Sequence, residues 1–247
     1  MMTVILRSLA YQLFLYTSTV GIVLLHIPAL LMDGGVVRRG FGRWGRMQTW
    51  GLRVFAGIHI EIRGIENCPS EPVLVASKHQ SMLETSLFFS LLNQPSIILK
   101  KELSYIPLVG PLVRKAGLII LDRKGGGGAL RQMISDARAR IEDGQPILIF
   151  PEGHRMAPGA APDYQRGISM LYDKLKVPCV PVALNSGLFW PRRTFLRYPG
   201  TVVFHFLPAI APGLKGAEFL KTLEAAIEPV TNELIAEARK QLEDLRS

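Results

Sequence analysis

Short apolar segments alternate with helix-like stretches through most of the chain, and this alternation limits the possible folds more than any other feature. The segments are of strand length and several end in charged residues; they are IHIEIRGIEN, PVLVAS, PSIILKK, GLIILDRK, QPILIFPEGHR, VPCVPVALNSG and GTVVFHFLPAI. Strands that alternate with helices are typical of α/β domains, whose sheets are covered on both faces. The chain is therefore predicted to form an α/β domain with a mainly parallel, mixed sheet flanked by helices.

Three stretches between and around these segments are predicted to be helical. Residues 129–143 place apolar side chains on one face, and Gly144 is expected to end that helix. Residues 33–58 are predicted to form a basic amphipathic connector helix broken by glycines, and the tail from Gly216 a helix broken near Pro229. The tetraglycine at 125–128 lacks the G-K-[ST] of a phosphate-binding loop, so it is predicted to be a flexible lid or a plain turn.

The N-terminal region contains a run of 25 residues, Ser8–Met32, without Asp, Glu, Lys or Arg. A helix of about 20 apolar residues is long enough to cross a bilayer. The run is interrupted by polar residues and by Pro28, so three interpretations stay open: a span, a re-entrant hairpin bent at Pro28, or a helix buried in the core. We expect a hydrophobic membrane-anchoring helix or helical hairpin here.

The charge of the chain agrees with a membrane partner. Lys and Arg number 29 against 20 acidic residues, and a cluster follows the apolar run directly: Arg38, Arg39, Arg43, Arg46 and Arg53. Arginines on that side favour a cytoplasmic position for the following domain and contact with anionic membrane lipid. No pattern of a nucleic-acid-binding motif is present, so nucleic acid is not expected as a partner. We predict an anchor and connector over residues 1–58 and an α/β domain over 59–247.

A second stretch combines aromatic and basic residues. GLFWPRRTFLRYPG, residues 187–200, interleaves aromatic rings with Arg192, Arg193 and Arg197. Such a segment either rests on the membrane, with its arginines at lipid phosphate, or forms an ordinary exposed loop with packed aromatic side chains.

The stretch SKHQSMLETS holds one histidine, His79, and a carboxylate five residues later, Glu84. Ser81 and Glu84 have the spacing of a capping box, which would only start a helix. Alternatively, His79 and Glu84 form a catalytic pair. On one continuous helix they would diverge by about 140°, so the pair requires His79 in a loop and Glu84 in the first helical turn. The two interpretations share this geometry and compete for the carboxylate.

Polar residues follow four of the predicted strands. They are His79 with Glu84, Lys100 with Lys101, Arg123, and the segment 152–155. In open α/β sheets, ligands bind outside the carboxyl ends of the strands, so these groups are expected to meet in one cleft. Several cations there would suit a phosphate, because the arginine fork binds two oxygens at once.

Four blocks, in order, resemble those of the glycerolipid acyltransferases, in particular the 1-acylglycerol-3-phosphate acyltransferases. They are KHQSMLE, GLIILDR, FPEGHR and VPVALNSG, and they extend from about Ala76 to Asn185. The family usually has H-x-x-x-x-D in the first block and E-G-T-R in the third. Here Glu84 replaces the aspartate and His154 the threonine.

The resemblance implies an enzyme that moves an acyl group from a thioester, on coenzyme A or acyl carrier protein, to a lysophospholipid bearing a phosphate. It implies no metal and no cofactor beyond the acyl donor. His79 would be the general base and Glu84 would orient its ring. The substrate-binding residues would be Lys101, Arg123, Glu152, Gly153 and Arg155.

We therefore expect a membrane-bound acyltransferase that converts lysophosphatidic acid to phosphatidic acid. Two alternatives stay open: an enzyme that acylates another lysolipid, such as a lyso-ornithine lipid, and a non-catalytic module that binds membrane lipid.

Overall fold

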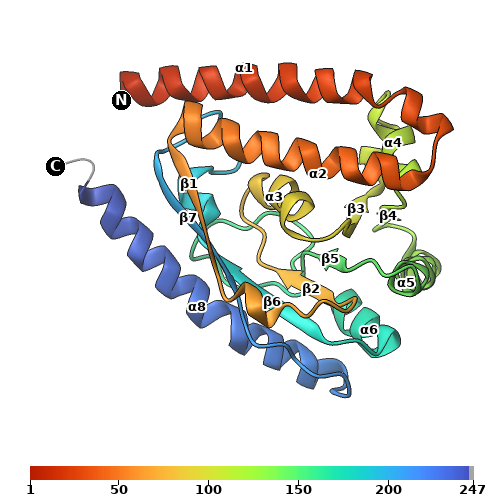
Figure 1. Ribbon diagram of the computed structural model, residues 1–247. Helices are drawn as coiled ribbons and strands as arrows, with labels where there is room; N and C mark the ends of the chain where they lie inside the picture. Colours follow the sequence, from red (N-terminus) through yellow and green to blue (C-terminus); the bar gives the residue numbers. More distant parts are fainter. Residues whose placement is uncertain (245–247) are drawn as a thin grey trace.

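A seven-stranded sheet forms the centre of the computed structural model, which describes residues 1–244 (Figure 1). Each predicted strand segment forms one strand: β1 (Ile58–Arg63), β2 (Leu74–Ser77), β3 (Ser96–Lys100), β4 (Ile119–Leu121), β5 (Ile147–Ile149), β6 (Cys179–Leu184) and β7 (Gly200–Phe206). The strand order is β1-β7-β6-β2-β5-β3-β4. From β6 to β4 all neighbours are parallel; β7 is antiparallel to β6 and parallel to β1. The predicted α/β fold with a mainly parallel sheet is confirmed.

Helices cover both faces of the sheet. They are α1 (Met2–Leu25), α2 (Gly34–Gly51), α3 (Leu83–Leu91), α4 (Val109–Lys115), α5 (Gly126–Glu142), α6 (Arg166–Leu175), α7 (Ser186–Phe189) and α8 (Gly216–Asp244). Short turns of 3-10 or π-helix are η1 (Pro28–Leu31), η2 (Leu52–Ala56), η3 (Ile65–Asn67) and η4 (Lys101–Tyr105). Val75 belongs to a core shared with α1–α4, whereas Leu74 and Ala76 belong to a core shared with α5, α6 and α8. Alternate strand residues thus face opposite helical layers, which explains why whole strands are apolar.

The topology gathers the predicted site residues at one edge of the sheet. The strands β2, β5, β3 and β4 are parallel neighbours, so their carboxyl ends lie side by side. The loops after these strands carry His79, Glu152, Lys101 and Arg123. This is the edge at which ligands of open α/β sheets bind.

The apolar N-terminal run forms α1, which turns at η1 and folds back along α2 as a helical hairpin (Figure 1). Its polar residues bind α2: the Ser18 hydroxyl accepts a hydrogen bond from Gln48 (3.0 Å), and that of Thr19 accepts one from the Trp44 indole (3.0 Å). The opposite face exposes large apolar side chains, namely Leu6, Leu9, Leu13, Tyr16, Val20 and Leu24. One face of α1 therefore packs on the protein while the other remains uncovered.

The segment 187–200 fixes α1 to the domain. Arg197 and Trp190 are both buried, and the guanidinium lies 4.0 Å from the centre of the indole ring. The main-chain N–H of Arg197 donates to the Ser8 hydroxyl (2.8 Å), and its side chain donates to Gln12 (3.3 Å). Burial lowers the pKa of Arg197 to about 10. The predicted packing of aromatic side chains is therefore confirmed for Trp190, but the predicted exposed loop is wrong at Arg197, which is buried and does not face lipid.

The glycines of α2 do not break the helix, contrary to the prediction. They allow neighbouring helices to approach closely: a Cβ on Gly45 would lie 2.3 Å from the carbonyl oxygen of Ser86 in α3. A Cβ on Gly51 would lie 2.2 Å from the Phe14 ring in α1. Close packing against α1 and α3 thus compensates for the low intrinsic helix propensity of glycine.

Two other boundary predictions were also wrong. The tetraglycine is neither a lid nor a plain turn, because Gly126–Gly128 form the first turn of α5. The last helix, α8, passes through Pro229 without ending. Its buried residues before and after the proline, such as Ile227 and Leu234, pack in the same core, and this burial offsets the backbone hydrogen bond that the proline removes.

The predicted division at residue 58 coincides with the start of β1. Residues before it, such as Tyr11 and Val37, share one hydrophobic core with strand residues after it, such as Val75. The assignment of two separate domains stays a prediction.

Candidate active site

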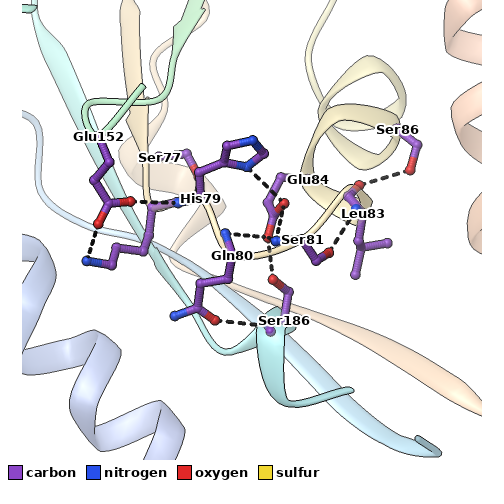
Figure 2. Close-up of polar contacts among 11 residues, drawn as sticks. Ser77, His79, Gln80, Ser81, Leu83, Glu84, Ser86, Glu152 and Ser186 are labelled. Carbon is purple, nitrogen blue, oxygen red and sulfur yellow. Dashed lines mark hydrogen bonds and ion pairs between the residues drawn. The ribbon is translucent and has the colours of Figure 1, made fainter. Parts of the chain in front are cut away.

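The loop after β2 brings His79 and Glu84 together. His79 lies in the loop and Glu84 in the first turn of α3, as the spacing requires. Nδ1 of His79 lies 3.2 Å from Oε2 of Glu84 (Figure 2). The Glu84 side chain is fully buried, whereas that of His79 is 15% exposed. The ring can therefore meet a ligand while its partner is shielded from water.

The Glu84 carboxylate is held by several further donors. It accepts the main-chain N–H groups of Ser81 (3.0 Å) and Gln80 (3.3 Å), and a short hydrogen bond from the Ser186 hydroxyl (Figure 2). The Ser81 hydroxyl in turn accepts the N–H of Leu83 (2.9 Å). The predicted competition for the carboxylate was wrong, because one carboxylate caps the helix start and binds the imidazole simultaneously.

The loop after β5 makes three contacts with His79, one with its ring and two with its main chain. The Phe150 ring stacks on the imidazole with centres 3.9 Å apart and planes 15° apart. Glu152 Oε2 accepts the main-chain N–H of His79 (3.3 Å), and the His79 carbonyl accepts the N–H of Met156 (2.7 Å). A carboxylate oxygen accepts, so the tautomer with Nδ1–H facing Glu84 fits this contact, and that tautomer leaves Nε2 to accept a proton.

Glu152 is buried beside a lysine from the same loop as His79. Its Oε1 forms an ion pair with Lys78 (2.5 Å), which also donates to Glu228 of α8 (2.7 Å). Burial raises the pKa of the Glu152 carboxyl, and Lys78 acts in the opposite direction. Glu152 thus makes contacts inside the protein, and its contact with substrate stays a prediction.

A cavity of about 480 Å³ lies between the sheet, α5 and α6. Its polar lining includes Arg123, Glu152 and His154, and most of the remainder is apolar. Gly153 also lines it and has a φ of +68°, a conformation that favours glycine. Neither His79 nor Glu84 lines this cavity, so the expectation that all these groups meet in one cleft was wrong; Phe150 lines the cavity and stacks on His79.

The predicted cationic residues are not all placed alike. Arg123 lines the cavity, and partial burial lowers its pKa. Lys101 instead pairs with Asp122 (3.0 Å) and does not line this cavity. Arg155 is exposed outside the lining, and its carbonyl oxygen accepts a hydrogen bond from Arg192 (2.5 Å). Only Arg123 among these three is brought to the cavity.

Sequence reasoning missed four residues of this site. Ser186 and Phe150 lie within blocks that carried the resemblance, and Lys78 directly precedes the histidine. These three residues could be located beside the motifs in the sequence, but no spacing in the motifs predicted which groups they contact. Glu228 lies 150 residues from Lys78 in the chain, so no motif joins the two.

A family model described as Acyltransferase matches residues 59–185. A 1-acyl-sn-glycerol-3-phosphate acyltransferase of Pseudomonas aeruginosa is 34% identical over 194 residues, which cover 78% of this chain and 76% of that protein. The chain belongs to the acyltransferase family.

Other relatives agree with this assignment. A human 1-acyl-sn-glycerol-3-phosphate acyltransferase alpha is 32% identical to this acyltransferase over 143 residues, 57% of this chain and 50% of the human protein. The fold also matches the crystal structure of the 1-acyl-sn-glycerophosphate acyltransferase PlsC from Thermotoga maritima. The TM-score is 0.74 at 22% identity, over 94% of this chain and 96% of that one.

Proposed function

We propose that this acyltransferase moves a fatty acyl group from an acyl thioester to the free hydroxyl of 1-acylglycerol-3-phosphate, making phosphatidic acid. The observation that carries the proposal is the pairing of a partly exposed His79 with the buried carboxylate of Glu84. The names of the relatives support this substrate and product. The donor is proposed to be acyl-coenzyme A or acyl-acyl carrier protein.

In the proposed step, Nε2 of His79 takes the hydroxyl proton as the substrate oxygen attacks the thioester carbonyl carbon. The tetrahedral intermediate then collapses, the C–S bond breaks, and the leaving thiolate takes the proton from the imidazolium. Glu84 holds the Nδ1–H tautomer and stabilises the imidazolium while it exists. General base catalysis of this kind contributes about 10²–10⁴-fold in rate. The step uses no metal and no covalent enzyme intermediate.

The substrate phosphate is proposed to bind at Arg123, with Gly153 leaving room for the ligand in the turn. The position of Arg123 in the cavity and its fork of donors support this role. Arg155 and Lys101 are proposed as further contacts, on the strength of the family resemblance; they lie outside the cavity lining, so each would have to approach a bound headgroup from its rim.

Membrane attachment is proposed to occur through α1. Within residues 1–244, the stretch Met2–Leu31 is long and apolar enough to cross a bilayer. The exposed apolar face of α1 supports contact with lipid, and its packed face favours a helix that lies in the interface over one that spans. The arginines of α2 support anionic lipid as a partner and a cytoplasmic position for the catalytic domain.

The proposal is tested with purified protein, lysophosphatidic acid and a labelled acyl thioester. Release of free thiol should accompany formation of labelled phosphatidic acid in equal amounts. A panel of lysolipids with and without a terminal phosphate tests the headgroup. An Arg123→Gln variant should lose its preference for the phosphate-bearing acceptor. Binding of lysolipid without release of thiol from the acyl thioester, with every acceptor in the panel, would contradict the proposed activity.

A further inference from the structure

A buried ion network lies next to the histidine, and among its members only Glu152 also lines the cavity. Lys78 contacts two carboxylates, Glu152 at 2.5 Å and Glu228 at 2.7 Å. The side chains of Lys78, Glu152 and Glu228 are 2%, 0% and 15% exposed. Tyr164 completes the network by donating its hydroxyl to Glu228 (2.8 Å). Charged groups are rarely so deeply buried unless they are paired.

The Glu152 carboxylate connects this network to His79. One oxygen pairs with Lys78, and the other accepts the main-chain N–H of His79. Figure 2 shows Glu152 reaching toward the main chain of His79. A shift of the Glu152 carboxylate would therefore release one of the three contacts by which the β5 loop holds His79.

Lys78 forms an ion pair with this carboxylate on the side away from the His79 N–H. Buried charges are held strongly where they are paired, because separation would leave each charge without water or partner. Glu228 fixes Lys78 from the other side, and Glu228 belongs to α8. Neither Lys78 nor Glu228 lines the cavity, so neither is placed to contact a ligand there.

We propose that Lys78 and Glu228 are positioning residues for the general base: they lock Glu152, which fixes the main chain of His79 against Glu84. The C-terminal helix α8 is thereby part of the catalytic apparatus, although it supplies no group that touches substrate. This inference rests on the proposed role of His79. It assigns to Glu152 an action through the base in addition to any contact with substrate.

The test compares variants in two backgrounds, the wild-type chain and His79→Ala, with thiol release as the readout. Glu228→Gln preserves the shape of the side chain and removes its charge, and Lys78→Met removes the cation. The matched control is Glu233→Gln, an exposed carboxylate on the same helix. Thermal unfolding establishes that each variant is folded at the assay temperature, and Glu228→Gln carries the test if Lys78→Met does not fold.

In the wild-type background we expect kcat to fall about 100-fold for Lys78→Met and about 10-fold for Glu228→Gln, with KM for the lysolipid unchanged, because small displacements of a catalytic group cost this much. The double variant should be no slower than Lys78→Met, since both act on one network. In the His79→Ala background, neither substitution should change the residual rate.

Three results would overturn the inference. The first is an equal fold-loss from Lys78→Met in both backgrounds, which would mean that Lys78 acts on substrate or on the fold. The second is a rate for Glu228→Gln equal to that of Glu233→Gln. The third is an undiminished rate for His79→Ala alone. This result would refute the role of His79 as general base and therefore also this inference, whereas the first two results would refute only the inference.

Discussion

Oε2 of Glu84 lies 3.2 Å from Nδ1 of His79, while the same carboxylate accepts the N–H of Ser81 at the start of α3. One carboxylate thus caps the start of a helix and also pairs with the histidine. The hydrogen bonds that begin the helix also fix the carboxylate that faces the imidazole. The glutamate, one methylene longer than the family's aspartate, reaches both partners.

Ser186 should contribute to the rate through Glu84. Its hydroxyl donates to Oε1 of the buried carboxylate, and hydrogen bonds to charged groups are worth about 1.5–3 kcal/mol. Ser186→Ala should lower kcat by about 10-fold or more, with little change in KM, in steady-state assays of thiol release. The control is Ser96→Ala, which removes a buried hydroxyl bonded to the carbonyl of Gly117. An effect on kcat as large in Ser96→Ala as in Ser186→Ala would contradict this role.

Gly45 should be intolerant of any side chain. A Cβ there would lie 2.3 Å from a main-chain oxygen of α3, and a main-chain atom cannot turn aside as a side chain can. Gly45→Ala is expected to lower the free energy of unfolding by about 1–3 kcal/mol, measured by urea denaturation. Gly128→Ala, where a Cβ meets nothing within 4 Å in the first turn of α5, should leave stability equal or raise it. Equal stabilities of the two variants would show that α2 does not pack as described.

Glu152 should make stability depend on pH. Burial raises the pKa of its carboxyl in the folded protein above that in the unfolded chain, so between these two values the folded state binds more protons. The free energy of unfolding should therefore fall as pH rises through this interval and then level off above the folded pKa. Urea denaturation across this pH range should show a smaller decrease in the free energy of unfolding for Glu152→Gln, because the glutamine side chain has no proton to lose. An identical slope in both proteins would contradict the raised pKa.

The exposed face of α1 should determine membrane binding. Leu9 and Leu13 are 51% and 67% exposed, and burial of a leucine side chain contributes about 1.5–3 kcal/mol. Leu9→Ser/Leu13→Ser should weaken binding to anionic vesicles by about 100-fold in sedimentation assays. The control is Ile65→Ser/Met170→Ser, two exposed apolar residues of the α/β domain. Equal loss of binding in both double variants would show that α1 has no special part in attachment.

Features set by local pattern were predictable from the sequence. Strand segments follow from apolar runs. The spacing of His79 and Glu84 allows a contact between a loop residue and a first-turn residue, and the family resemblance led to the prediction that they pair. What was missed depends on contacts between distant parts of the chain. Ser186 lies 102 residues from Glu84, and Arg197 lies 185 residues from Gln12. Arg197 was a candidate for lipid contact because a buried arginine and an exposed one look alike in sequence.

The central claim, that His79 is the general base of an acyl transfer, is tested most directly by thiol release with lysophosphatidic acid and an acyl thioester. His79→Ala should lower kcat by about 10²–10⁴-fold while lysolipid binding persists. His59→Ala, an exposed histidine of β1, should retain the wild-type rate. A folded His79→Ala protein that releases thiol as fast as the wild type would contradict the account.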